Sequence, residues 1–149
     1  MRIYLAAAVF SMADKLFNSY IKEILEELTN IEVFLPQNIS PYNKDGRKDM
    51  RHVFLKCKSE IDTSDMIVAV VDGADVDAGV SWELGYAYSQ GIPYICIRTD
   101  NRKSEDKGVN VMLEYSAKEM CYVKYDASKQ EFYEILIRMV EQVRLNLKR

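Results

Sequence analysis

The sequence is poor in the residues that hold metals and that build histidine-dependent catalytic groups. Its 149 residues include one histidine, His52, and three cysteines. Cys57, Cys96 and Cys121 are widely spaced and form no Cys-x-x-Cys pair. Structural zinc sites need several such ligands, and serine or cysteine nucleophiles of the triad type need a partner histidine. The composition therefore argues against both, and it predicts a cytoplasmic protein with reduced thiols and neither metal nor cofactor.

Motifs for binding phosphates and membranes are also missing. The first apolar segment ends in alanines at positions 6–8 rather than in Gly-x-Gly-x-x-Gly, and no Gly-Lys-Ser or Gly-Lys-Thr occurs. Both absences argue against a dinucleotide or nucleoside triphosphate site. No apolar run approaches the roughly 20 residues of a membrane span, and no separate signal-peptide region is visible. The formal net charge of −3 argues against a general nucleic-acid binder.

What the sequence does contain is an alternation between two hydrophobic periods. Apolar runs typical of buried strands cover residues 3–8, 31–35, 66–71, 93–97 and 120–123. Apolar residues at helical spacing cover 11–28, 48–61, 81–90 and 128–143. Ser11 with Asp14, and Ser128 with Glu131, form capping boxes that predict two helix starts. Residues 36–46 and 98–108 are predicted to be loops.

Strands that alternate with helices predict a parallel sheet with helices on both faces. We expect a single α/β domain over residues 1–149, with a flavodoxin-like, doubly wound, five-stranded parallel sheet. In such sheets, ligands bind beyond the carboxyl ends of the strands, at the switch point of the strand order. The loops that follow the first and third strands are therefore expected to form the site.

An acidic loop follows the predicted strand 66–71. Asp72, Asp75 and Asp77 stand beside glycines, so they are suited to hydrogen-bonding a polyol such as a sugar; a solvated acidic turn is the alternative. Glu83 falls in the first turn of the helix predicted from Ser81. The helix dipole favours an ionised carboxylate there, and such a group acts as a nucleophile in glycosyl chemistry. A favourable first-turn acid without catalytic function is the other interpretation.

The segment SDMIVAVVDGADVDAGVSWELGYA, residues 64–87, resembles the signature of the nucleoside 2-deoxyribosyltransferase family. Ile3-Tyr4-Leu5-Ala6 resembles the first strand of that family, and Asn110-Val111-Met112-Leu113 resembles its late Asn-x-Met segment. The order and spacing of these pieces agree over most of the chain, and the central block is the most specific of them.

The resemblance implies an enzyme that moves a 2-deoxyribosyl group from a deoxynucleoside to a free nucleobase. Glu83 falls on the nucleophile that attacks the anomeric carbon and carries a 2-deoxyribosyl ester. Tyr4 falls on the tyrosine that orients this carboxylate, and Asp77 falls on the acid that binds the sugar hydroxyls. Asp72 and Gly79 belong to the same motif and are expected to contribute to substrate binding.

Three further residues gain roles from the resemblance. Phe10 matches an aromatic residue that lines the base pocket. Asn110 and Met112 match residues that reach the site of a neighbouring subunit, which implies a homo-oligomer of at least two chains with a shared active site.

The chain departs from the family pattern at two places. Ala7-Ala8 stands where members commonly have Gly-Pro, and gapless counting places Cys57 where many have Asp or Asn, at a position associated with the leaving base. Because a thiol is a weak donor, base protonation falls to another group such as Asp72 or solvent, or the register differs. N-glycoside hydrolysis of deoxynucleosides or their monophosphates, and a non-catalytic nucleoside-sensing domain, therefore stay as alternatives.

Related nucleoside-monophosphate hydrolases tend to have serine where this chain has Asp77. A carboxylate at that point would repel a 5′-phosphate, so Asp77 favours a free nucleoside over a nucleotide.

Overall fold

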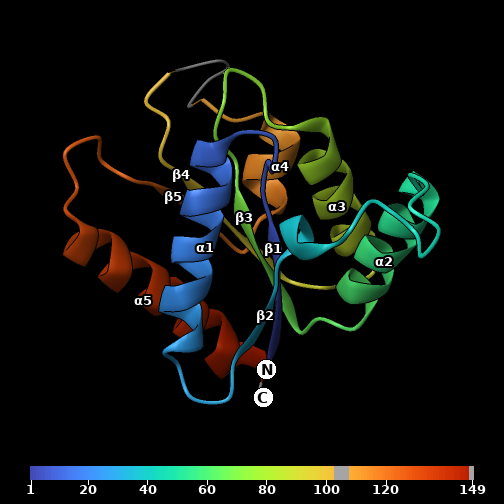
Figure 1. The fold of residues 1–149 in the computed structure, drawn as a ribbon. Helices are drawn as coiled ribbons and strands as arrows, with labels where there is room; N and C mark the ends of the chain where they lie inside the picture. The colour runs from blue at the N-terminus through green and yellow to red at the C-terminus, as the bar shows by residue number, and fades with distance from the viewer. Residues whose placement is uncertain (103–107, 148–149) are drawn as a thin grey trace.

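The computed structural model describes residues 1–102 and 108–147, in which helices cover both faces of one sheet (Figure 1). The strands are β1 (Arg2–Ala6), β2 (Glu32–Phe34), β3 (Met66–Val70), β4 (Tyr94–Arg98) and β5 (Glu119–Tyr122). The α-helices are α1 (Met12–Glu26), α2 (Met50–Asp62), α3 (Ala78–Ser89), α4 (Val111–Ser116) and α5 (Lys129–Leu147), and a short 3₁₀ helix covers Pro36–Asn38. Residues 103–107 of the predicted loop 98–108 lie outside the described part.

The five strands are parallel and lie in the order β2-β1-β3-β4-β5. This is the flavodoxin-like order, whose switch point lies between β1 and β3. Helices α1 and α5 pack on one face of the sheet, and α2 and α3 pack on the other (Figure 1). The predicted α/β fold, with a five-stranded parallel sheet and helices on both faces, is confirmed.

The alternation of side chains along β1 determines what reaches each face. Ile3 and Leu5 belong to the apolar layer under α1 and α5, whereas Tyr4 and Ala6 belong to the layer under α2 and α3. All four side chains are fully buried. The phenol of Tyr4 is thereby held on the same side of the sheet as α3.

The helix starts agree with the sequence in part. The capping box of Ser11 and Asp14 is present, and α3 begins at Ala78 rather than at the predicted Ser81. The side chain of Asp77 accepts a hydrogen bond from the Val80 amide and so caps the helix three residues earlier. Gly79 lowers helix propensity in this first turn, which hid the true start from the hydrophobic pattern. The short helix α4 was not predicted.

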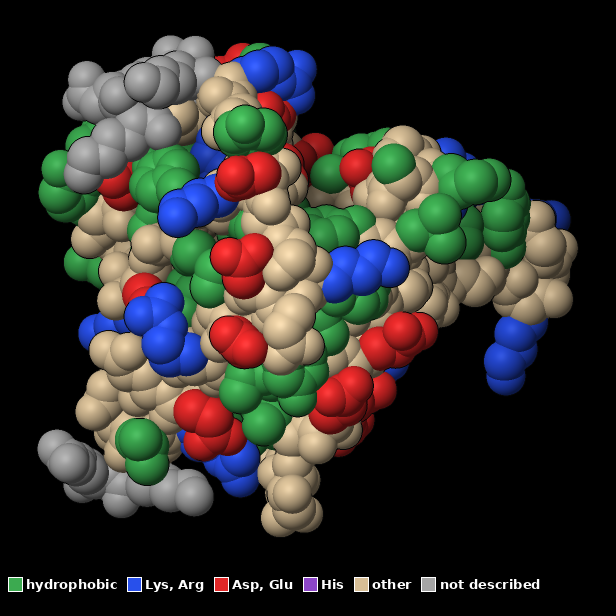
Figure 2. All heavy atoms as spheres, turned by 90° about the vertical axis from the view of Figure 1, so that its left-hand side faces the viewer, with side chains coloured by type: hydrophobic (Ala, Val, Ile, Leu, Met, Phe, Trp, Pro, Cys, Tyr) green, Lys and Arg blue, Asp and Glu red, His purple; other side chains and the backbone are tan. Residues whose placement is uncertain are grey.

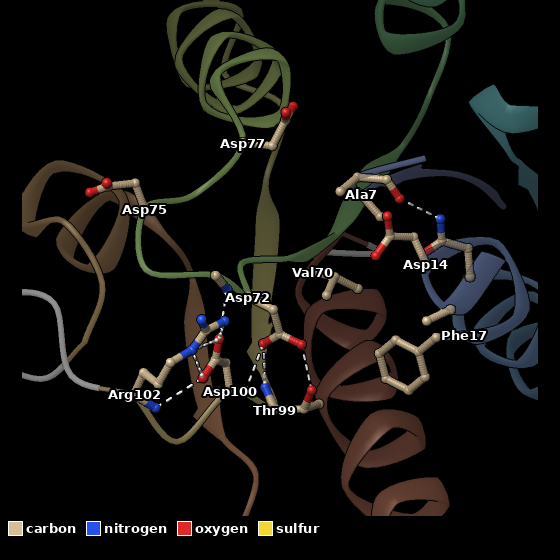
Figure 3. Close-up of a pocket in the computed structure, with 14 residues that line it drawn as sticks. Ala7, Asp14, Phe17, Val70, Asp72, Asp75, Asp77, Thr99, Asp100 and Arg102 are labelled. Atoms are coloured by element: carbon tan, nitrogen blue, oxygen red, sulfur yellow. Dashed lines mark hydrogen bonds and ion pairs between the residues drawn. The ribbon is translucent and has the colours of Figure 1, made fainter. Parts of the chain in front are cut away.

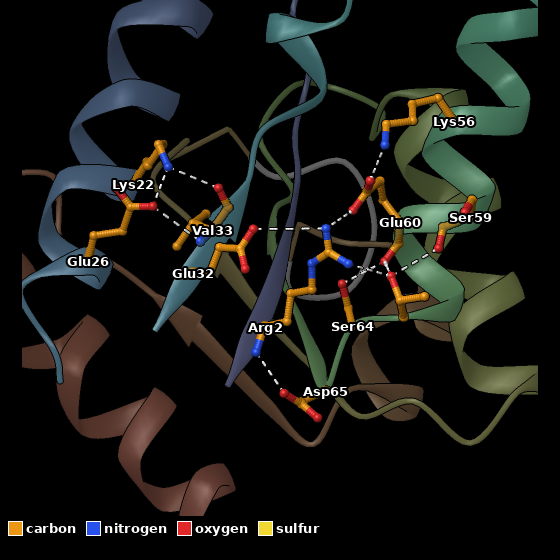
Figure 4. Close-up of polar contacts among 11 residues, drawn as sticks. Arg2, Lys22, Glu26, Glu32, Val33, Lys56, Ser59, Glu60, Ser64 and Asp65 are labelled. Carbon is orange, nitrogen blue, oxygen red and sulfur yellow. Dashed lines mark hydrogen bonds and ion pairs between the residues drawn. The ribbon is translucent and has the colours of Figure 1, made fainter. Parts of the chain in front are cut away.

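Ion pairs hold the edge of the sheet where the strands begin (Figure 4). Arg2 lies 2.7 Å from the buried carboxylate of Glu60, and its backbone amide donates to Asp65. On the side of α1 and α5, acidic and basic side chains are interspersed (Figure 2). In the part of the chain that the structure describes, no helix is long and apolar enough to cross a membrane.

Candidate active site

A partly buried carboxylate and a buried phenol meet between β1 and α3. The hydroxyl of Tyr4 donates a hydrogen bond to Oε1 of Glu83 over 2.5 Å. Tyr4 is fully buried, and Glu83 lies five residues after the first helical residue, Ala78. Glu83 therefore stands in the second turn of α3. The expectation that it stands in the first turn is wrong, because the helix begins at the Asp77 cap.

This position changes the electrostatics of Glu83. Burial raises the pKa of Glu83 to about 7, and the negative charge of Asp77 adds to the rise while the hydrogen bond from Tyr4 opposes it. Loss of water around the carboxylate therefore works against the ionised form, which the helix start was predicted to favour. A carboxylate whose pKa is close to neutral pH is typical of an active site.

Asp77 lies next to this pair at the start of α3. Its Oδ1 accepts a hydrogen bond of 3.1 Å from the Val80 amide. A Cβ atom at Gly79 would lie 3.0 Å from the same oxygen, so glycine leaves the space that the carboxylate occupies. Among the described residues, the Val80 amide is the one hydrogen-bond donor to this carboxylate.

Asp72 joins the loops that follow β3 and β4. Its carboxylate accepts hydrogen bonds from the amides of Thr99, over 2.6 Å, and Asp100, over 2.9 Å, and from the Thr99 hydroxyl. The buried Arg98 crosses the same loops and donates to the carbonyls of Val71 and Gly73. These bonds fix the shape of the segment that leads to Asp77.

A pocket of about 680 Å³ opens at the carboxyl ends of β1, β3 and β4 (Figure 3). Its charged lining residues are Asp14, Asp72, Asp75, Asp77, Asp100 and Arg102. The guanidinium of Arg102 is paired with Asp100, so the pocket presents mainly carboxylates. Its volume suits a small polar molecule such as a nucleoside. Tyr4 and Glu83 do not line it, and Asp77 is the residue that connects it to them.

Cys57 of α2 packs beside the same pair. Its partly buried side chain lies against the apolar layer that contains Tyr4. Burial raises the pKa of this thiol; a hydrogen bond with the Tyr4 hydroxyl opposes the rise, and the nearby charge of Glu83 adds to it. The thiol is therefore neutral at physiological pH, and it provides neither a second carboxylate nor a strong acid.

Comparison with family models identifies a match to nucleoside 2-deoxyribosyltransferases over residues 3–113. The chain belongs to this family. Its tyrosine–glutamate pair thus occurs in an enzyme of the nucleoside deoxyribosyltransferase and N-glycosidase group. Comparison with curated protein sequences finds no match.

Solved structures agree with this assignment. A conserved protein from Enterococcus faecalis V583 superposes with a TM-score of 0.73 at 26% identity, over 93% of this chain and 98% of the other. A 2-deoxyribosyltransferase from Bacillus psychrosaccharolyticus gives 0.69 at 25% identity, over 83% and 87%. A CMP N-glycosidase from Clostridium botulinum, at 19% identity and a TM-score of 0.61 over 93% and 99%, shares the fold.

Other residues that the deoxyribosyltransferase resemblance singled out lie apart from Glu83. Phe10 is 79% exposed and does not line the acidic pocket. Asn110 caps α4 by accepting a hydrogen bond of 2.9 Å from the amide of Met112, whose side chain is 74% exposed. Within one chain, no contact of these three side chains with Tyr4 or Glu83 is found among the described residues.

Asn110 and Met112 line a second pocket, of about 690 Å³, between α3 and α4. Ser81 and Gly85 form its α3 wall. Ser81 and Gly85 are each two residues from Glu83, and two residues correspond to a rotation of about 200° around the helix axis. This wall therefore lies on the side of α3 opposite Glu83. The second pocket is thus separated from the carboxylate of Glu83 by the body of α3.

Sequence reasoning missed Phe34, the last residue of β2. Its ring stacks on Tyr4 with 5.6 Å between centroids and 21° between planes. The signal was present in the expected parallel pairing of the first two strands, which sets one aromatic residue beside the other. Strand register cannot be read from a single sequence, so the contact was not predicted.

Proposed function

We propose that this enzyme transfers a 2-deoxyribosyl group between nucleobases through an ester on Glu83. The observation that carries the proposal is the partly buried carboxylate of Glu83, which accepts a hydrogen bond from the hydroxyl of Tyr4 and lies near Asp77 of the acidic loop. A pure binding module needs no carboxylate buried at this energetic cost. The residues 1–149 are proposed to act as one domain.

The reaction consists of two displacements at the anomeric carbon. In the first, Glu83 forms a C–O bond as the C–N bond breaks, and the departing base keeps the bonding electrons and takes up a proton. In the second, a nitrogen of the incoming base attacks the same carbon, loses its proton and releases the carboxylate. Because Tyr4 donates to Oε1, we propose that Oε2 is the attacking atom.

The proton for the departing base is proposed to come from solvent. Cys57 is a neutral thiol with a raised pKa and donates weakly. The carboxylate of Asp72 already accepts three hydrogen bonds from residues 99 and 100, which leaves it poorly placed as an acid. Bases that leave readily without a strong acid are therefore expected to be the better substrates.

Hydrolysis of the N-glycosidic bond is the second candidate, and Cys57 is the observation that favours it, because a weak donor also binds an incoming base weakly. The two activities are separated by incubating the protein with a 2′-deoxynucleoside, with and without a second free base. A new nucleoside formed only with the second base indicates transfer. Free base and deoxyribose released without it indicate hydrolysis, and no reaction with any deoxynucleoside contradicts both.

A free deoxynucleoside is expected to be a better substrate than its 5′-monophosphate. Asp77 and the other carboxylates of the pocket repel a phosphate, and one charge pair at about 4 Å costs roughly 1–4 kcal/mol at a partly hydrated site. We expect kcat/KM for the nucleoside to exceed that for the nucleotide at least tenfold. Asp77→Ser should bring this ratio closer to one, whereas Asp45→Ser, on an exposed side chain outside the pocket, should change the ratio little. A nucleotide preferred by the unaltered protein would contradict this interpretation.

We further propose that the active site is completed in a homo-oligomer. This proposal is supported by the position of Asn110 and the exposed Met112, which line a pocket on the far side of α3 from Glu83. Equilibrium sedimentation tests the association.

A further inference from the structure

The ring of Phe34 is in contact with the catalytic pair that we propose. Phe34 ends β2 and is the register partner of Tyr4 in β1. Side chains paired across parallel strands lie on the same face of the sheet, and here the two rings stack with centroids 5.6 Å apart. Tyr4 is fully buried and its hydroxyl reaches Glu83 over 2.5 Å. The direction of that hydroxyl therefore depends on where the tyrosine ring is held.

The ring of Phe34 also lies near a cation. The ammonium group of Lys56 lies 5.8 Å from the centroid of the Phe34 ring. Lys56 is itself held by an ion pair with the buried carboxylate of Glu60, which also pairs with Arg2 (Figure 4). Phe34 is partly buried, with Tyr4 stacked on its ring and Lys56 nearby, so its established ring contact is with the tyrosine.

We propose that Phe34 is a positioning residue, which holds the ring of Tyr4 so that its hydroxyl proton points at Glu83. This inference rests on the proposed function for its effect on turnover, although the contact itself does not. A planar side chain fixes the tilt of a neighbouring ring, whereas a branched aliphatic side chain of similar size leaves the tilt free. The phenol oxygen lies on the axis that joins the ring to Cβ, so a rotation about this axis leaves the oxygen in place. It does turn the ring plane, in which the O–H bond prefers to lie, and so it bends the hydrogen bond away from a linear geometry and weakens it.

The readout is the titration of Glu83 itself. The titratable groups that face it are Tyr4 from β1, Cys57 from α2 and Asp77 at the start of α3. Of these contacts, the hydrogen bond from Tyr4 is the one that lowers the pKa of Glu83. Loss of its alignment should therefore raise that pKa above its value in the unaltered protein.

The experiment follows the carboxyl carbon of Glu83 by NMR in uniformly labelled protein, assigned with Glu83→Gln. In Phe34→Leu, Glu83 is expected to titrate at higher pH than in the unaltered protein. In Phe34→Tyr, which keeps a ring, Glu83 is expected to titrate at the same pH as in the unaltered protein. The control is Phe132→Leu, because Phe132 is equally part of an aromatic stack, with Tyr20, but lies under α1 on the opposite face of the sheet. In Phe132→Leu, the titration of Glu83 should be the same as in the unaltered protein.

Kinetics supplies the second readout. In Phe34→Leu, kcat should fall roughly threefold to tenfold with KM nearly constant, since misplacement of a catalytic group affects the transition state more than binding. An unchanged titration of Glu83 in Phe34→Leu, or an equal shift in Phe132→Leu, would overturn the inference. A shifted titration in a protein that is inactive on every deoxynucleoside would support the positioning contact and contradict the proposed function.

Discussion

Replacement of Glu83 by alanine or glutamine is expected to lower deoxyribosyl transfer by roughly 10³-fold or more, the scale of losing a group that forms a bond to the substrate. The physical reason is that neither side chain can form the ester. KM for the deoxynucleoside should change far less, because Asp77 and the pocket are intact. Initial rates of new nucleoside formation, with a deoxynucleoside donor and a free base acceptor, measure the effect.

The thermal stability of Glu83→Gln shows whether a loss of activity comes from lost chemistry or from a damaged fold. The pKa of Glu83 is raised from 4.5 to about 7 in the folded protein, so the folded state binds the proton more tightly than the unfolded state. The raised pKa leaves the free energy of unfolding unchanged below about pH 4.5. This free energy falls as pH rises from about 4.5 to 7, and above pH 7 it stays lower by at most roughly 3 kcal/mol. Glu83→Gln removes this cost, so it should melt at a higher temperature than the unaltered protein at pH 8. A glutamine variant that is inactive and also less stable at pH 8 would indicate a structural role instead.

Replacement of Tyr4 by phenylalanine is expected to lower kcat by about tenfold to a hundredfold and to shift the pH profile. The nucleophile must be ionised, so kcat/KM of the unaltered enzyme should rise with pH through about 7. Removing the hydrogen bond from Tyr4 removes the interaction that lowers the pKa of Glu83. The acid limb of the profile should therefore move to higher pH in Tyr4→Phe, and part of the lost activity should return in alkaline buffer.

Tyr86→Phe is the matched control. The hydroxyl of Tyr86 also donates to a carboxylate, that of Asp62 over 2.6 Å, but this pair lies on the exposed side of α2 and α3. The acid limb of the pH profile of kcat/KM in Tyr86→Phe should coincide with that of the unaltered enzyme. If Tyr4→Phe kept both the rate and the profile of the unaltered enzyme, the orienting role of Tyr4 would be wrong.

The fold was predictable because each strand and most helices carry local signals. The buried runs around Ile3 and Ile67 and the capping box of Ser11 are readable without any tertiary contact. The start of α3 was not, since Gly79 weakens the helical pattern and the cap is a single hydrogen bond from the Val80 amide to Asp77. Six residues of α4 are too few to show a hydrophobic period.

The site was predictable in its residue types and less so in its electrostatics. The motif drew attention to Glu83 and Tyr4, which the fold brings within hydrogen-bonding distance. A sequence does not show that burial, rather than the helix dipole, governs the pKa of Glu83, because burial depends on how β1, α2 and α3 pack. The same holds for Phe34, whose contact with Tyr4 is set by strand register.

The most direct test of the account is to look for the ester on Glu83. The protein is mixed with a 2′-deoxynucleoside in the absence of any acceptor base, quenched in acid and analysed by intact mass and peptide mapping. We predict a 2-deoxyribosyl adduct on the peptide that contains Glu83, absent from Glu83→Gln and discharged as a new nucleoside when a free base is added before quenching. An adduct on another residue, or rapid transfer by Glu83→Gln, would contradict the claim that Glu83 is the nucleophile.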